Sequence, residues 1–328
     1  MTGSSQTTWM GRNATALACF AVLLPLPVLM PDAFTLGVLT LALLAAAAAL
    51  AWNLCGGYAG QLSLGHAAFY GIGAYTSTLL YLKFGISPLI GMWAGAAVSA
   101  IAAILLGVVT MRLKGSFFVM STLAFGAVVH IAAINLRELT GGPSGLSIPL
   151  KPNVANLIFA SKVAYAYWAL GLVLAYYVIS RSIAASKIGY SLIAYRENHE
   201  AARALGIRTL RLRIFAFALS AAMVSLCGTL HAQYYLYIDP DSVMNLGLSL
   251  TFALMAIVGG LATSYGPIVG AGVVSILSFA MQFYLGDQVS GLTQVAYSAI
   301  VIVVLLAMPM GLGPTIGSYL SRRLAWQR

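Results

Sequence analysis

Long runs of apolar residues, separated by short clusters of charged and turn-forming residues, extend along most of the chain. A hydrocarbon core of about 30 Å needs roughly 20 residues of helix for each crossing, and ten runs approach or reach that length. They cover approximately residues 14–31, 33–54, 66–82, 88–111, 115–136, 163–180, 214–236, 247–262, 266–285 and 293–309. The pattern predicts an all-α fold, a polytopic transmembrane helical bundle of about ten helices, in a single domain over residues 1–328.

The distribution of charge predicts how this bundle is oriented. Only 7% of the residues are charged and 61% are hydrophobic, which excludes a water-soluble protein, in which about 25% would be charged. With the N-terminus in the cytoplasm, 13 of the 17 basic residues fall on the inner side. They are Arg12, Arg112, Lys114, Arg181, Lys187, Arg196, Arg203, Arg208, Arg211, Arg213, Arg322, Arg323 and Arg328. Because excess lysine and arginine mark the cytoplasmic side, both termini are predicted to be cytoplasmic.

The net charge of +10 is therefore a signal of topology and of contact with anionic membrane lipids, and no nucleic-acid partner is expected. No carboxylate, lysine or arginine falls in the middle of a predicted span. A charge at the bilayer centre costs roughly 3 kcal/mol or more and is usually retained for coupling or ion transport. The absence of such charges argues against an ion-coupled carrier and suggests that energy comes from a partner.

No enzymatic machinery is visible in the sequence. It contains no H-E-x-x-H, G-x-S-x-G or P-loop motif, and its three cysteines, Cys19, Cys55 and Cys227, lie far apart. We therefore expect no metal, no cofactor and no catalytic residue. The polar residues within the spans are open to two interpretations, interhelical hydrogen bonding or substrate contact. They are Asn53, Gln61, His66, His130, Asn135 and His231.

Two glycine-rich strings interrupt the apolar runs. Residues 56–66 read GGYAGQLSLGH and residues 259–267 read GGLATSYGP, so both contain Gly-Gly-x-Ala followed by Ser-x-Gly. Irregular backbone at membrane depth must be buried in protein or line a watery cavity, so the strings are candidates for the substrate path. The residues that we assign to this path are Gly56, Gly57, Gln61, Ser63, Gly65, His66, Gly259 and Gly260. Close helix packing at the glycines is the alternative.

Both strings follow helices that run inward, so they do not form an inverted repeat. A zwitterionic substrate would need no arginine here, because backbone N–H groups at a broken helix end can bind its carboxylate. This is a hypothesis that the missing intramembrane charges motivate.

Residues 181–213 form the only sizeable inner loop, with seven basic and two acidic residues. An apolar stripe at helical spacing comprises Ile188, Leu192, Tyr195, His199 and Ala202. Asn198 can cap a short helix with Glu200 in its first turn and Arg203 in its last, and Gly206 suits a left-handed terminator. Such a helix is too short to be stable alone, so it should dock on a partner or on the membrane surface.

The segment from Glu200 to Gly206 reads EAAxxxG and resembles the loop by which membrane subunits of bacterial ABC importers dock on their ATPases. It departs from the commonest pattern at Ala216, where isoleucine is usual. The string at 57–69, TLAFG at 122–126, LTGGPSGL at 139–146 and VGGL at 258–261 occur in order around this loop. Together, over residues 36–313, they resemble the permease subunits of branched-chain amino acid ABC transporters.

This resemblance implies a fold related to ribose-type permeases and a location in the bacterial inner membrane. It also implies a second homologous permease, usually non-identical, two cytoplasmic ATPase subunits and a periplasmic substrate-binding protein. The residues expected to couple to the ATPase are Arg196, Glu197, Glu200, Ala201, Ala202, Arg203 and Gly206. The loop of Thr140, Gly141, Gly142 and Pro143 would face the binding protein.

The function that follows is import of branched-chain or other hydrophobic amino acids, with ATP hydrolysis in the partner subunits and not in this chain. Permeases for urea and short amides look similar and remain an alternative within the family. An ion-coupled carrier or a membrane scaffold is the alternative outside it.

Overall fold

The computed structural model describes residues 24–29, 32–111, 115–285, 299 and 311–313. Its elements up to residue 158 are α2 (Leu26–Leu29), α3 (Ala33–Asn53), η1 (Leu54–Tyr58), α4 (His66–Phe84), α5 (Pro88–Thr110), α6 (Ser116–Asn135), α7 (Arg137–Thr140), η2 (Gly142–Ser144), β1 (Leu146–Ser147) and η3 (Val154–Asn156). They are followed by α8 (Lys162–Ala184), α9 (Lys187–Glu197), α10 (His199–Ala204), α11 (Thr209–Tyr235), β2 (Tyr237–Ile238), α12 (Pro240–Val243), α13 (Leu246–Gly259) and α14 (Gly266–Leu285).

Eight of the predicted spans correspond to long helices: α3, α4, α5, α6, α8, α11, α13 and α14. The predicted span at 14–31 overlaps the described residues only around α2, and the one at 293–309 lies outside them except for residue 299. Within the described residues, seven helices are long and apolar enough to cross a membrane. These features make the chain an all-α, multi-pass membrane protein.

The helix α4 does not belong to those seven, and its surroundings explain why. Its 19 residues include histidine, tyrosine, serine and threonine side chains, and eleven of the 19 are buried. A helix that is surrounded by other helices does not face lipid and needs no continuous apolar surface, so its polar residues are tolerated. Its ends follow local rules: Gly85 closes α4 with φ of 66°, and Ser87 caps α5 just before Pro88.

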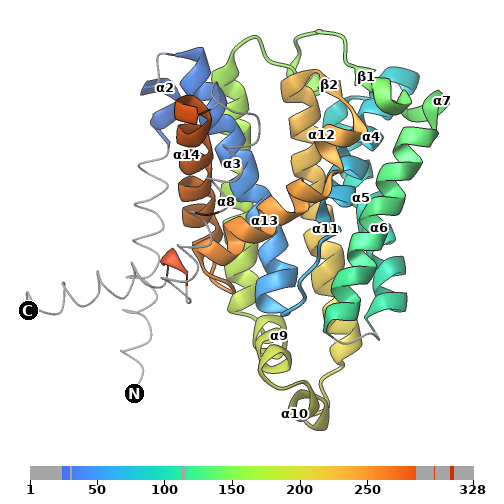
Figure 1. Cartoon of the computed structure of the whole chain (residues 1–328), viewed down its shortest axis with the longest axis vertical. Helices are drawn as coiled ribbons and strands as arrows, with labels where there is room; N and C mark the ends of the chain where they lie inside the picture. The colour runs from blue at the N-terminus through green and yellow to red at the C-terminus, as the bar shows by residue number, and fades with distance from the viewer. Residues whose placement is uncertain (1–23, 30–31, 112–114, 286–298, 300–310, 314–328) are drawn as a thin grey trace, which may run out of the picture.

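The bundle is built around α11, which packs against α3, α4 and α5. On one side α8 and α14 pack on α3, and on the other α6 covers α4 and α5, while α13 crosses obliquely between the two groups (Figure 1). Successive long helices alternate in direction. As a result α9 and α10 project from one end, and α7, α12 and the antiparallel pair β1–β2, with Leu146 opposite Ile238, lie at the other.

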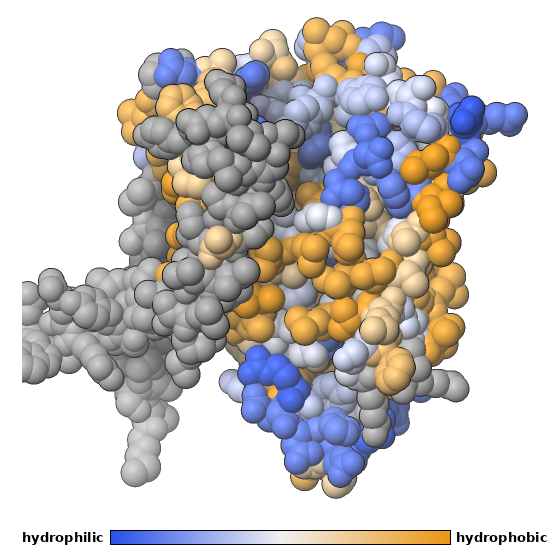
Figure 2. Space-filling model, in the orientation of Figure 1, coloured by the Kyte–Doolittle hydropathy of each residue, from blue (hydrophilic) through white to orange (hydrophobic). Residues whose placement is uncertain are grey.

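Polarity follows the same axis. Figure 2 shows hydrophobic residues across the middle of one face and hydrophilic residues at the end that carries α9 and α10. The basic residues of 181–213 gather at this end, whereas Glu138, Asp239 and Asp241 belong to the opposite one. A middle band that is apolar between two polar ends is the arrangement that a bilayer requires.

Close packing of α4 on α11 depends on two glycines. A Cβ atom on Gly73 would overlap the backbone carbonyl of Ser225, and one on Gly228 would overlap that of Tyr70. The approach allows Thr229 Oγ1 to donate to the Gly73 carbonyl at 3.1 Å. Here glycine serves helix packing, as small residues do at helix contacts in membranes.

We expect Gly73→Ala and Gly228→Ala to destabilise the protein, although alanine is intrinsically better in helices by about 1 kcal/mol. Overpacking of this kind costs roughly 1–3 kcal/mol, so the thermal midpoint in detergent should fall. Gly171→Ala is the matched control, because a Cβ there meets nothing within 4 Å. Midpoints equal to that of the control would contradict this packing account.

Candidate functional site

The first glycine-rich string forms a break between α3 and α4. The helix α3 passes into the π-helical turn η1, all five residues of which are buried, and regular structure resumes only at His66. A Cβ on Gly56 would overlap the Trp52 ring, and one on Gly57 would overlap the Asn53 side chain. Gly60 has φ of 65°. Because π-helical turns are rare and are frequent at functional sites, this break is a candidate functional site.

The second string forms a break between α13 and α14. Gly260 and Ala262 have positive φ angles of 116° and 57°, and the helix resumes at Gly266. A Cβ on Gly259 would overlap the Gly266 carbonyl, so the two helices approach too closely for any side chain there. As the sequence predicted, both breaks follow helices that run toward the end that carries α9 and α10 (Figure 1).

The amide of Asn53 joins the two breaks directly. Its Nδ2 donates to the Thr263 carbonyl at 2.9 Å, and its Oδ1 accepts from the Ala262 N–H at 3.0 Å. Beside it, the hydroxyls of Tyr58 and Ser264 lie 3.1 Å apart. The buried Asn53 side chain thus replaces the backbone partners that residues 262–263 lack outside a helix.

His66 belongs to a closed hydrogen-bond network at the start of α4. Its Nε2 lies 2.8 Å from Ser220 Oγ and its Nδ1 lies 3.0 Å from Ser63 Oγ. Because Ser220 donates its own proton to the Ala51 carbonyl at 2.6 Å, the network assigns the imidazole proton to Nε2. His66 is fully buried, with both nitrogens occupied, so it fastens α4 to α11 rather than facing a cavity.

The N–H groups at the start of α4 also have partners within the protein. Ala67 N–H donates to Ser249 Oγ at 2.8 Å, and Leu64 N–H donates to Thr122 Oγ1 at 3.1 Å. Gly65 N–H contacts Ser63 Oγ at 3.4 Å. In this conformation these donors are engaged, so a substrate carboxylate would have to displace a hydroxyl to reach them. The contact of the assigned path residues with substrate stays a prediction.

The inner loop touches the first break through Arg196. This residue, in the last turn of α9, donates from Nη1 to the Gly57 carbonyl at 3.0 Å and from Nη2 to Glu197 at 2.9 Å. Its aliphatic stem lies against Gly60, where a Cβ would come within 2.7 Å of Arg196 Cγ. The end of α9 is therefore seated on the break.

The short helix after α9 has the predicted form. Asn198 Oδ1 accepts from the N–H groups of Glu200 and Ala201 at 3.0 and 3.1 Å, and Gly206 has φ of 79°. Ala202 is buried against the protein, whereas Leu205 is 79% exposed at the tip. The apolar stripe is not carried by one helix, because the cap at Asn198 separates α9 from α10.

Sequence reasoning missed the role of Arg213. The predicted span began at 214, but α11 begins at Thr209 and brings Arg213 inside, where it is only 8% exposed. Its Nη1 donates to the Met111 carbonyl at 2.8 Å, and its guanidinium carbon lies 5.0 Å from the centre of the Tyr195 ring. The amide orientation that satisfies Gln61 directs its oxygen to Arg213, with Nη2 2.9 Å away.

These groups border a cavity of about 490 Å³ between the first break and the inner loop. Gln61, Tyr195, Arg203 and Arg213 line it together with apolar side chains such as Phe118. Its lining contains arginine but no carboxylate. Of the residues assigned to the substrate path, Gln61 alone lines this cavity, whereas His66 and Ser63 belong to the buried network.

The loop assigned to the binding-protein side lies at the end opposite α10 (Figure 1). Thr140 Oγ1 donates toward the carbonyls of Ala133 and Leu136, at 2.6 and 2.8 Å. Gly141 and Gly142 have φ angles of 75° and 59°, so this turn, which continues into Pro143, requires glycine at both positions. The part of the chain that the structure describes has no group of three His, Cys, Asp or Glu side chains that could hold a metal ion.

Comparisons with known proteins place this arrangement in a family. Residues 34–309 match the family model described as branched-chain amino acid transport system, permease component. The high-affinity branched-chain amino acid transport system permease protein LivM is 32% identical in Salmonella typhimurium, over 68% of this chain and 57% of that protein. The Escherichia coli LivM is 30% identical, over 72% and 61%. The permease protein LivH of Salmonella typhimurium is 24% identical, over 80% of this chain and 89% of its own length.

No solved structure matches the chain significantly. The matched region spans about three fifths of the length of the two LivM relatives, 57% and 61%. The family model nevertheless covers most of the chain. Its range includes both breaks and the inner loop, which Arg196 joins to the first break. The chain belongs to the family of branched-chain amino acid transport system permease components.

Proposed function

We propose that this chain is the transmembrane subunit of an ATP-binding-cassette importer that carries branched-chain, hydrophobic amino acids across the bacterial inner membrane. The observation that carries the proposal is the capped helix α10, which projects from one end of the bundle and connects through α9 to a broken membrane helix. Membership in the permease family supports it. Residues 1–328 then form one permease domain with both termini in the cytoplasm.

The proposed partners follow from the two polar ends. At the end carrying α9 and α10, two cytoplasmic ATPase subunits would receive the coupling residues from Arg196 to Gly206. At the opposite end, a periplasmic binding protein would meet the turn at residues 140–143. A second homologous permease would complete the path, as LivM and LivH are both permease proteins of such systems.

An external source of energy is consistent with where the charges lie. Each carboxylate in the described residues belongs to an end of the bundle or to a connecting segment, including Asp32, Glu138 and Asp241. Such a bundle has few ionisable groups that could couple transport to an ion gradient, whereas a docked ATPase could move α9 and α10 mechanically.

The proposed route of coupling passes through a few contacts. A displacement of α10 would move α9, and Arg196 at the end of α9 holds the Gly57 carbonyl. Gly57 lies against Asn53, which holds residues 262–263 of the second break. A movement at the ATPase surface would therefore reach both breaks together.

The proposed function predicts ATP-dependent uptake of labelled leucine by proteoliposomes that contain this chain, a second permease, the ATPase subunits and the binding protein of the same organism. Omission of this chain or of the ATPases should abolish uptake. Urea offered in the same system should not accumulate. Leucine uptake by this chain alone on an ion gradient would overturn the proposal.

Arg196→Ala should uncouple the transporter. A hydrogen bond from a charged donor is worth about 1.5–3 kcal/mol, so we expect transport to fall roughly tenfold or more while ATP hydrolysis continues. Arg196→Lys, which retains one donor, should recover part of the transport. The control is Arg211→Ala, because Arg211 is an exposed basic residue in the first turn of α11. Equal transport by Arg196→Ala and Arg211→Ala would refute a coupling role for Arg196.

A further inference from the structure

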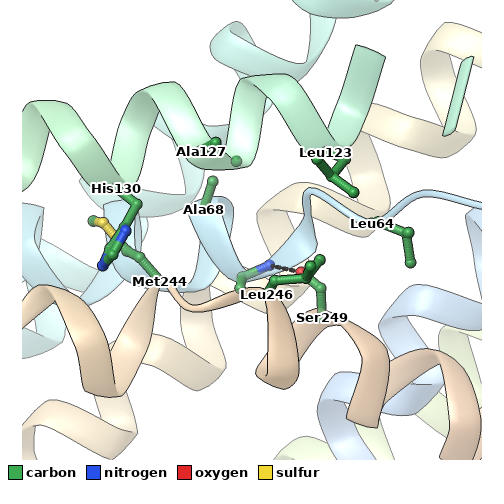
Figure 3. Close-up of a pocket in the computed structure, with 10 residues that line it drawn as sticks. Leu64, Ala68, Leu123, Ala127, His130, Met244, Leu246 and Ser249 are labelled. Carbon is green, nitrogen blue, oxygen red and sulfur yellow. Dashed lines mark hydrogen bonds between the residues drawn. The ribbon is translucent and has the colours of Figure 1, made fainter. Parts of the chain in front are cut away.

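A second cavity, of about 150 Å³, lies where α4 and α13 begin, against the side of α6. Figure 3 shows Ala68 of α4 facing Ala127 of α6, with His130 on one side and Leu123 on the other. The wall is apolar apart from Ser249, whose hydroxyl accepts from Ala67 N–H, and His130. Of the residues assigned to the substrate path from the sequence, none lines this cavity.

The volume of the cavity limits what it can hold. An apolar cavity of about 150 Å³ is large enough for one benzene molecule. A branched alkyl group of three or four carbons is smaller than benzene or about its size, so the side chains of valine, leucine and isoleucine fit. The apolar side chains that form most of the wall favour an aliphatic occupant.

Asp241 does not line the cavity but contacts it through His130. His130 lines the cavity, and its Nε2 lies 2.8 Å from Asp241 Oδ1 on α12. The Asp241 side chain is 78% exposed, at the end of the bundle opposite α10. An amino acid with its side chain in the cavity would bring its ammonium group toward this carboxylate. Its carboxylate would then face the start of α4, where the helix dipole is positive and where it would displace Ser249 Oγ from the Ala67 N–H.

We propose that this cavity, lined by α4, α6 and α13, is the subsite that holds the aliphatic side chain of the amino acid during translocation, with Asp241 binding the ammonium group. The inference rests on the proposed function and adds a determinant of substrate size within the membrane subunit. Gly126 of α6 lines the cavity beside Leu123 and Ala127.

Gly126 can be changed without disrupting the fold. A Cβ there would lie 3.5 Å from Gly65 Cα and 3.8 Å from the Leu64 carbonyl oxygen, which are ordinary contacts. Gly65 is different, because a Cβ at that position would overlap the Thr122 carbonyl. Position 126 therefore allows the cavity to be narrowed by small steps.

The test compares uptake of leucine and valine by the complete transporter with Gly126→Ala, each amino acid at a concentration that saturates the binding protein. In a hydrophobic pocket one methylene group alters discrimination by about tenfold or more. We therefore expect the leucine-to-valine uptake ratio to fall roughly tenfold. Gly272→Ala, whose Cβ would meet nothing within 4 Å, should leave the ratio unchanged.

An unchanged ratio in Gly126→Ala, or an equal loss of both substrates, would overturn the proposal. Leucine uptake by the wild-type transporter tests the proposed function separately. If the wild type takes up leucine but the ratio does not change in Gly126→Ala, only the subsite is refuted.

Asp241→Asn provides an independent measurement. It should raise the half-saturating concentration for both amino acids alike, whereas Glu138→Gln, at another exposed carboxylate of the same end, should not. Equal values for the two variants would refute the role of Asp241.

Discussion

Backbone that leaves the helical conformation inside a bilayer must find hydrogen-bond partners within the protein, because lipid supplies none. In this chain Asn53 meets that requirement for both breaks at once: it donates to Thr263 and accepts from Ala262, about 210 residues away in sequence. Glycine at position 57 is needed for the same reason, since a larger residue would collide with the Asn53 amide. The joined breaks fix where α3 ends and where α14 begins, and thereby the packing of both helices in the bundle.

The joined breaks also connect the inner loop to the membrane-spanning helices. Arg196 binds the Gly57 carbonyl, so α9 and α10 contact the first break directly and the second through Asn53. Helices that end in irregular segments can shift by changing a few backbone angles, whereas continuous helices must move as rods. The cavity beside α4 and α13 lies next to the same segments, at the start of the two helices that the breaks and the network around His66 position.

Features encoded by neighbouring residues were predictable from the sequence. Hydrophobic runs located eight long helices to within a few residues, Asn198 and Gly206 located the ends of the α10 segment, and the glycine strings located both breaks. What depends on tertiary contact was not predictable. The pairing of the breaks through Asn53 and the pair of His130 with Asp241 join distant segments, and periodicity carries no information about such pairs. Arg213 was misplaced because the start of α11 was predicted five residues too late.

Hydrogen exchange of the complete transporter tests most directly whether Asn53 holds the second break. Asn53→Leu keeps the branched shape and the number of side-chain heavy atoms but removes both hydrogen bonds, so the backbone amide of Ala262 loses its acceptor. The account predicts faster exchange in residues 260–265, unchanged exchange in α5 and loss of leucine transport. Asn135→Leu, at an exposed asparagine that bonds within its own helix, should change neither exchange nor transport. Wild-type exchange at 260–265 together with full transport in Asn53→Leu would contradict the account.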